Sequence, residues 1–223
     1  MSLRSALTDF VEDRYRGAAG TLKGIHALRR GYFGDMSPIE TPGIREQRPV
    51  ETLDTAASAS APPDQGRLLF HLARTFQPAR ALELGTNIGI SAAYMAVGLV
   101  YGGGRSLTTI ELSDHRLAVA RSNFEELGLA NIETIRGRFD DVLPEILGRP
   151  RAFEMAFIDG NHRKDATLRY VRLLHQHMAP DSLMVLDDIR WSQGMWEAWQ
   201  EIGSSALAAH TVDLGRTGLL VTA

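Results

Sequence analysis

One short stretch, residues 81–91, constrains the fold of this chain more than any other. An apolar run ends beside an acid, Glu83, and a loop with Gly85 and Gly89 then leads directly into the apolar residues 91–100. Strand, glycine loop and helix in this order bring backbone N–H groups up to a nucleotide-like ligand in α/β proteins. A dinucleotide fingerprint needs three glycines in the spacing G-x-G-x-x-G, and this loop has only Gly85 and Gly89, four residues apart. The stretch therefore predicts an α/β fold and disfavours a nicotinamide dinucleotide as the ligand.

The composition narrows the class of protein. A chain of 223 residues can form one domain with a full core, and a net charge of −3 gives no reason to expect nucleic acid or an anionic membrane as partner. The longest apolar stretch, residues 88–101, is too short to span a bilayer, and the N-terminus lacks the apolar core of a secretory signal. The chain has no cysteine, which excludes disulfides, thiolate metal sites and cysteine nucleophiles. We expect a cytoplasmic protein that binds neither nucleic acid nor membranes.

The chain divides into two uneven parts. Residues 1–62 carry several arginines and only weak periodicity, and we expect an N-terminal arm with helical and irregular segments. Such an arm would cover the site or pair two subunits of a homodimer. Residues 56–63 are small and proline-rich, which predicts a linker or loop. Residues 63–223 are expected to form the ligand-binding domain.

Strand-like and helix-like runs alternate regularly after residue 64, which predicts a parallel sheet with helices on both faces. Two short runs near the C-terminus, joined by a glycine-containing turn, predict a hairpin that ends the sheet with an antiparallel strand. The expected strands are 80–84, 106–111, 132–136, 154–159, 183–187, 208–214 and 218–222. The expected helices are 65–76, 90–100, 115–127, 141–147, 163–177 and 191–202.

The ends of the predicted strands carry the candidate ligand-binding residues, because ligands of open parallel sheets collect at the carboxyl ends of the strands. Glu111 ends the second strand, where an acid can accept hydrogen bonds from two ribose hydroxyls. Phe139 and Asp140 follow the third strand and offer an aromatic face and a carboxylate to an adenine. The remaining acids at strand ends are Glu83, Asp159, Asp187 and Asp188.

These motifs resemble those of class I S-adenosylmethionine (SAM)-dependent methyltransferases. Within that class the chain from about residue 64 is similar to the small bacterial O-methyltransferases related to catechol and caffeoyl-CoA O-methyltransferases. The resemblance is carried by Leu82-Glu83-Leu84-Gly85 with Gly89-Ile90-Ser91, by Phe157-Ile158-Asp159-Gly160-Asn161-His162, and by Val185-Leu186-Asp187-Asp188. It implies a doubly wound, mostly parallel, seven-stranded sheet of the Rossmann-like methyltransferase fold.

The resemblance also implies a role for each residue at the cofactor. The loop residues would wrap the methionine part of SAM, Ser91 would bind its carboxylate and Glu111 its ribose. Phe139 and Asp140 would flank the adenine, and Glu83 would orient the loop or meet the amino group. The implied cofactor contacts are Glu83, Gly85, Thr86, Asn87, Gly89, Ser91, Glu111, Phe139, Asp140 and Asp159.

Metal-dependent relatives use Mg²⁺ to hold and acidify the acceptor hydroxyl, and Asp159, Asp187 and Asp188 are the oxygen ligands that Mg²⁺ or a similar divalent cation prefers. Adjacent strand residues point to opposite faces, so Asp187 and Asp188 can share a cation only if the chain bends there. Catechol-type relatives carry Asp-Asn at this position, whereas this chain has Asp-Asp. The alternative is a solvated or capping aspartate pair.

Two residues after the fourth strand are candidates for the catalytic base. Lys164, one of two lysines in the chain, is expected in the first turn of a helix that Asn161 could cap, where the positive helix end depresses its pKa. His162 is the rival base, and it could instead pack against the adenine. A surface lysine is the structural alternative for Lys164.

The sequence thus predicts an enzyme that moves the methyl group of SAM to a hydroxyl oxygen of a small-molecule acceptor, either with Mg²⁺ or without a metal. A SAM-binding protein without turnover is the alternative from another class. A nicotinamide-dependent oxidoreductase is the rival enzyme, and the missing glycine disfavours it. The acceptor itself cannot be read from the sequence.

Overall fold

The structure is a computed structural model of the chain, and it describes residues 3–12, 17–40, 50–149 and 152–223. Its strands are β1 (Pro38–Ile39), β2 (Glu51–Thr52), β3 (Arg80–Leu84), β4 (Ser106–Glu111), β5 (Ile132–Arg136), β6 (Met155–Ile158), β7 (Leu183–Leu186), β8 (Ala208–Asp213) and β9 (Gly218–Thr222). Its helices are α1 (Leu3–Val11), α2 (Ala19–Gly31), α3 (Leu53–Ala59), α4 (Pro63–Phe76), α5 (Ile90–Gly102), α6 (Asp114–Glu126), α7 (Phe139–Leu147), α8 (Lys164–His175) and α9 (Gln193–Gly203).

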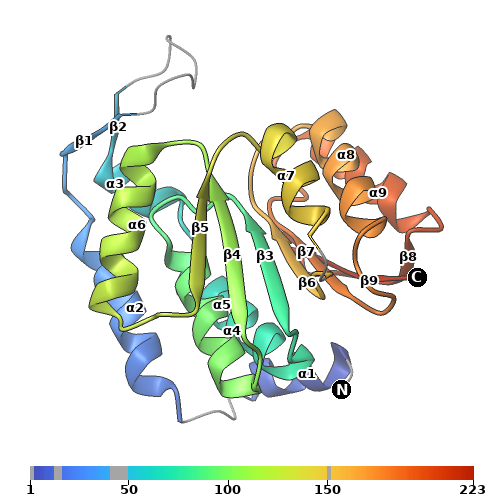
Figure 1. Cartoon of the computed structure of the whole chain (residues 1–223), viewed down its shortest axis with the longest axis horizontal. Helices are drawn as coiled ribbons and strands as arrows, with labels where there is room; N and C mark the ends of the chain where they lie inside the picture. The colour runs from blue at the N-terminus through green and yellow to red at the C-terminus, as the bar shows by residue number, and fades with distance from the viewer. Residues whose placement is uncertain (1–2, 13–16, 41–49, 150–151) are drawn as a thin grey trace. The chain divides into compact units, whose positions relative to one another are not determined.

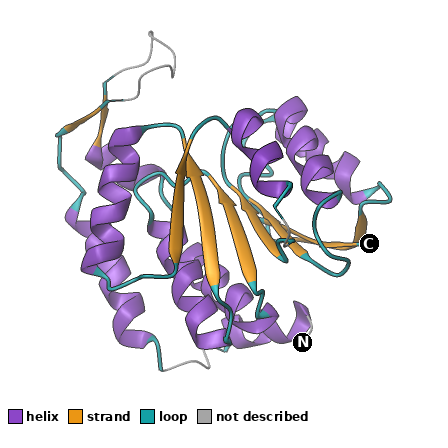
Figure 2. Cartoon of the chain, viewed as in Figure 1, coloured by secondary structure: helices purple, strands orange, loops and turns teal. Residues whose placement is uncertain are grey.

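The described residues form a seven-stranded sheet with the order β5-β4-β3-β6-β7-β9-β8, and β1 pairs separately with β2 (Figure 1). The pairs β4–β5, β3–β6 and β6–β7 are parallel, whereas β9 runs antiparallel to β7 and to β8. Helices alternate with these strands along the chain (Figure 2). The prediction of a mostly parallel sheet that ends in an antiparallel hairpin is confirmed.

The chain separates into two compact units. The first consists of Met1–Gln77 and Thr86–Arg138, and the second of Pro78–Gly85 and Phe139–Ala223. The domain boundary expected at residue 62 is based on composition and on the alternation of strands and helices, and it stays a prediction. The role of residues 1–62 as a cap or dimer contact also stays a prediction. Part of that arm lies outside the described residues.

Close helix packing builds the core of the first unit. A Cβ at Gly66 of α4 would lie 2.3 Å from the ring of Tyr94 on α5, and a Cβ at Gly98 of α5 would lie 2.4 Å from the carbonyl oxygen of Phe70. Only glycine allows this approach, so the two glycines set the distance between α4 and α5. Helices α1 and α2 pack on α4 and α5 respectively.

The second unit is built on strands that are buried on both faces. Strands β6 and β7 are buried along their full length, and β3 is buried after its first residue. Continuous apolar runs of this kind are typical of interior parallel strands. Helices α8 and α9 pack on each other (Figure 1). Trp199 of α9 is buried against the hairpin, where a Cβ at Gly218 would lie 2.7 Å from its ring.

The linker predicted at residues 56–63 is wrong. Most of it belongs to α3 and to the start of α4, and Ala56 and Ala57 are fully buried. Thr52 caps α3, because its hydroxyl accepts the N–H of Thr55 while the Thr55 hydroxyl accepts the N–H of Thr52. Small residues are common in loops, but alanine is also the strongest helix former, and the cap at Thr52 favours the start of a helix here.

No helix in the described parts of the chain is both long enough and apolar enough to cross a membrane.

Candidate active site

Both loop glycines are required by the backbone and by their surroundings. Gly85 has φ +108°, and a Cβ there would lie 2.1 Å from the carbonyl oxygen of Asp159 in the second unit. Gly89 has φ +85°, and a Cβ there would lie 2.6 Å from the ring of Phe124 in the first unit. A side chain would be strained at either position, so the glycine pattern read from the sequence has a structural cause.

In the first unit, the loop is tied to the end of β4. The N–H of Thr86 donates to the carbonyl oxygen of Ile110 at 3.2 Å, and the hydroxyl oxygens of Thr86 and Thr109 lie 2.7 Å apart. Asn87 adopts φ +49° and donates its backbone N–H to Oε2 of Glu111 at 3.0 Å. These bonds fix the conformation of the loop.

Glu111 is buried and is the main organiser of this loop. Its Oε1 accepts the backbone N–H groups of Leu112 and Ser113 at 2.8 and 3.0 Å, and its Oε2 accepts that of Asn87. A carboxylate has about four acceptor positions, so three backbone bonds leave room for about one more. Nη1 of Arg116 also lies 3.7 Å from Oε2, and the binding of ribose hydroxyls by Glu111 stays a prediction.

Ser91 lies buried in the first turn of α5, directly after Gly89. The first N–H groups of a helix have no partner within the helix and carry partial positive charge, which favours an anionic group such as a carboxylate. In the described residues, Oδ1 of Asn87 is also buried without a hydrogen-bond partner. A donor group of a ligand would satisfy this amide oxygen.

In the second unit, Phe139 and Asp140 begin α7. A Cβ at Gly160 would lie 2.7 Å from the Phe139 ring, so the ring can occupy this position only because Gly160 has no side chain. Asp140 accepts hydrogen bonds from Nε and Nη2 of Arg169 at 2.9 and 3.2 Å, and the Tyr170 hydroxyl lies 3.4 Å away. The carboxylate of Asp140 is thus already engaged by an arginine that the sequence reasoning did not single out.

An acidic cluster lies in the second unit around the ends of β6 and β7. The chain bends at Asp188, which has φ +52°, and the carboxylates of Asp187 and Asp188 reach the same cation. That cation is Arg216 in the turn between β8 and β9. Its Nε lies 3.1 Å from Oδ1 of Asp187 and 3.0 Å from Oδ1 of Asp188, and its Nη2 lies 2.8 Å from Oδ2 of Asp187.

The electrostatics of this cluster follow from burial and like charge. The pKa of Asp159 is raised well above its ordinary value, first by burial and then by the negative charges of Asp187 and Glu83. Burial and the neighbouring Asp187 also raise the pKa of Asp188. Arg216 opposes both shifts through its positive charge.

The two candidate bases have different surroundings. Nε2 of His162 lies 3.5 Å from Oδ1 of Asp159 and 4.0 Å from Oδ2 of Asp188, so the imidazole faces the acidic cluster. Lys164 is in the first turn of α8 as expected, but its Nζ donates to Glu197 of α9 at 3.0 Å, and its side chain is 40% exposed.

Asn161 does not cap this helix. It adopts φ +54° and donates to the hydroxyl of Tyr170, and the helix begins without a side-chain cap.

The predicted metal ligands do not fit a divalent ion as they stand. Both oxygens of Asp187 are engaged by the Arg216 guanidinium, which also reaches Asp188. In the described parts of the chain, no group of three or more His, Asp or Glu side chains is arranged to hold a metal. The assignment of Asp159, Asp187 and Asp188 as a metal site stays a prediction, and Arg216 is the residue that it left out.

Arg216 could have been found from the sequence only through the register of the hairpin. Leu186 of β7 pairs with Gly218 of β9, which brings the turn before Gly218 to the end of β7. The glycine-containing turn predicted from the sequence is Gly215-Arg216-Thr217, and its strand pairing does not follow from the sequence pattern. The position of Arg216 next to Asp187 therefore becomes visible only in the structure.

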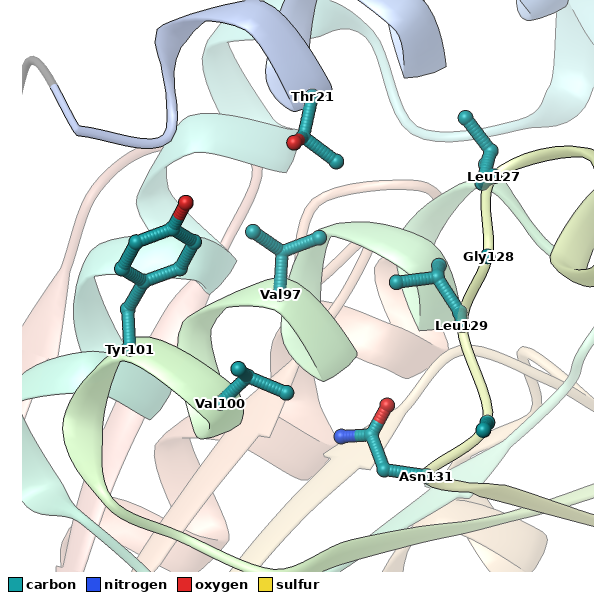
Figure 3. A pocket seen from close by; sticks show the side chains of 9 residues that line it. Thr21, Val97, Val100, Tyr101, Leu127, Gly128, Leu129 and Asn131 are labelled. Carbon is teal, nitrogen blue, oxygen red and sulfur yellow. The ribbon is translucent and has the colours of Figure 1, made fainter.

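A pocket of about 450 Å³ lies in the first unit, and none of the predicted site residues lines it (Figure 3). Figure 3 shows Thr21 of α2 on one side and the aliphatic side chains of Val97 and Val100 of α5 on another. Its lining residues are Thr21, Val97, Val100, Tyr101, Leu127, Gly128, Leu129, Ala130 and Asn131.

Known sequences support the resemblance that the motifs indicated. A family described as a methyltransferase domain matches residues 82–189. A catechol O-methyltransferase of Niastella koreensis is 34% identical over 132 residues, which cover 58% of this chain and 58% of that protein. The chain spans less than two thirds of the length of the first curated relatives that it matches.

Solved structures extend the likeness to most of the chain. The O-methyltransferase TomG from Streptomyces achromogenes, involved in tomaymycin synthesis and solved in complex with SAM, is 30% identical with a TM-score of 0.64, over 79% of this chain and 92% of TomG. An O-methyltransferase from Bacillus cereus in complex with SAH is 21% identical with a TM-score of 0.66, over 97% of both chains. The second comparison shows a common fold.

Proposed function

Because the chain belongs to the family of SAM-dependent O-methyltransferases, we propose that it transfers the methyl group of SAM to a hydroxyl oxygen of a small molecule. The observation that carries the proposal is the loop after β3, which Glu111 holds through the N–H of Asn87. The loop, the start of α5 at Ser91 and the carboxylate of Glu111 offer the kinds of group that the methionine and ribose parts of SAM require. The relative TomG was solved with SAM, which supports this ligand.

The residues around Phe139, Asp140, Glu83 and Asp159 indicate how each of these four could contact the cofactor. Phe139 supplies an aromatic surface for the adenine, and Gly160 leaves room beside that ring. Asp140 is held by Arg169, so we assign it the role of positioning its neighbours as well as meeting the adenine amino group. The positive sulfonium and ammonium groups of SAM would favour the ionised forms of Glu83 and Asp159, against the burial that raises the pKa of Asp159.

Methyl transfer is an in-line displacement, and the acceptor oxygen must lose its proton to become a good nucleophile. We assign this proton to Nε2 of His162. The acceptor oxygen forms a bond to the methyl carbon, the carbon–sulfur bond breaks, and its electron pair stays on sulfur, which leaves S-adenosylhomocysteine (SAH). The imidazolium that forms is stabilised by the nearby carboxylates of Asp159 and Asp188. Lys164 is engaged by Glu197 and is the less suitable base.

The test compares His162→Ala with Lys164→Ala, using SAM labelled in its methyl group and a panel of catechol, monohydroxylated and dihydroxylated aromatic acceptors. Loss of a general base lowers the rate by about 10²–10⁴-fold. We expect this loss for His162→Ala, with SAH binding retained, and a far smaller loss for Lys164→Ala. A larger loss for Lys164→Ala would assign the base to that residue instead.

A SAM-binding protein without turnover is the alternative. It would bind SAH in both variants and in the wild type, and would methylate no acceptor of the panel. The acceptor is proposed as a small molecule only. A homodimer built through residues 1–62 also stays a prediction, which sedimentation of the purified chain would test.

A further inference from the structure

We propose that Arg216 is the resident cation of the acidic cluster, and that methyl transfer by this chain therefore needs no divalent metal. This inference rests on the proposed function, and it concerns the place where the sequence predicted Mg²⁺. Its starting point is the bend at Asp188, because that bend is the condition under which Asp187 and Asp188 can share one cation. The cation that they share is a guanidinium.

The contacts fit a guanidinium better than a metal ion. Nε and Nη2 of Arg216 donate to the two oxygens of Asp187 in parallel, which is the paired geometry that arginine forms with carboxylates. The Asp187 side chain is 0% exposed, and a buried carboxylate of this kind requires a partner that satisfies both of its oxygens. A Mg²⁺ ion bound to the same oxygens would lie beside the positive charge of Arg216 and would be repelled by it.

The backbone holds Arg216 where its side chain is needed. Its carbonyl oxygen accepts the N–H of Ile189 at 3.0 Å, so the turn between β8 and β9 is joined to the residue that follows Asp188. A second ion pair, between Arg190 and Asp213 at 2.6 Å, ties the same two segments. The guanidinium is therefore not a mobile surface group, although the side chain is 46% exposed.

Arg216 acts as a positioning residue in this account. It fixes the carboxylates of Asp187 and Asp188 and neutralises part of their charge, while Asp188 and Asp159 face His162. It does not touch the reacting atoms in this scheme. Its removal would leave the aspartates with excess negative charge, which favours the capture of a divalent cation.

The test measures Mn²⁺ binding by electron paramagnetic resonance in the wild type, in Arg216→Met and in Arg216→Lys, each with SAH present. We expect no binding by the wild type at millimolar Mn²⁺ and at least tenfold tighter binding by Arg216→Met. Arg216→Lys should fall between them, because lysine keeps the charge but not the paired geometry. Arg190→Met is the matched control, because it breaks the neighbouring ion pair of the hairpin and leaves Asp187 and Asp188 engaged. It should bind no more Mn²⁺ than the wild type.

A second experiment measures the methylation rate of the wild type alone, so its outcome does not depend on whether a variant folds. We expect its methylation rate to be unchanged by a chelator and by added Mg²⁺. Loss of activity with chelator and its return with Mg²⁺ would overturn the inference, as would equal Mn²⁺ affinities of the wild type and a folded Arg216→Met. Failure of SAH to bind at all would instead overturn the proposed function.

Discussion

Replacing Gly85 by alanine tests whether the loop after β3 is held by a steric limit. The residue has φ +108°, which an L residue adopts at a cost of about 1–2 kcal/mol. The new Cβ would lie 2.1 Å from the carbonyl oxygen of Asp159, and a backbone atom cannot rotate away as a side chain can. Relief of such overlap costs a further ~1–3 kcal/mol, so the total loss of unfolding free energy is about 2–5 kcal/mol.

Gly103 provides the matched control for this substitution. It also has a positive φ, +80°, but nothing lies within 4 Å of a Cβ built there. Gly103→Ala should therefore show only the conformational cost of about 1–2 kcal/mol. The difference between the two variants isolates the contact of Gly85 with Asp159, and we expect it to be about 1–3 kcal/mol.

Urea denaturation of both variants, followed by tryptophan fluorescence, measures these free energies, and calorimetry with SAH measures the loop itself. We expect Gly85→Ala to bind SAH at least tenfold more weakly than the wild type, and Gly103→Ala to bind it with unchanged affinity. Equal stability of the two variants, together with unchanged SAH binding by Gly85→Ala, would refute the steric reasoning.

Three further substitutions test other parts of the fold. Ser113→Ala removes the cap of α6 and should cost about 1 kcal/mol of unfolding free energy in urea denaturation; an unchanged value would contradict the capping role. A backbone hydrogen bond from Gly215 holds the pKa of Asp213 below its ordinary value of 3.8, so Asp213→Asn should be less stable than the wild type at neutral pH. Because an acid with a lowered pKa stabilises the fold only while ionised, this difference should close as pH falls below 3.8, and a gap that persists in acid would contradict it. Gly66→Ala should cost about 1–3 kcal/mol through contact with Tyr94, and combining it with Tyr94→Leu should recover part of the loss.

The strands of the sheet could be predicted because their sequence signal is local. The predicted strands 80–84, 106–111 and 132–136 agree with β3, β4 and β5 residue for residue. Apolar runs bounded by polar or glycine residues fix such strands without knowledge of their neighbours. The cap of α6 at Ser113 and the glycine that follows the helix, Gly128 with φ +67°, obey local rules as well.

The errors arose where a residue's role depends on distant parts of the chain. Residues 56–63 read as a loop by composition, but buried alanines and a cap at Thr52 make most of them helical. Arg216 and Arg169 were missed because their carboxylate partners are 29 residues away in the chain. Partners at that separation depend on strand register and helix packing, which a single sequence does not specify.

In the candidate site, too, some features depend on local sequence and others on contacts between distant parts of the chain. The glycine loop and Glu111 could be predicted because a motif and a strand end define them. The surroundings of Lys164 and His162 could not, because they depend on how α9 and β7 pack against the start of α8. The structure turns Lys164 towards Glu197 and His162 towards Asp159, and the choice between them as base stays a prediction.

Calorimetric titration of the wild-type chain with SAH and, separately, with NAD⁺, both with excess chelator, tests the central claim most directly. We expect SAH to bind at one site per chain without any metal, Glu111→Gln to weaken this binding at least tenfold, and NAD⁺ to produce no binding heat. Binding of NAD⁺ with no response to SAH would contradict the account.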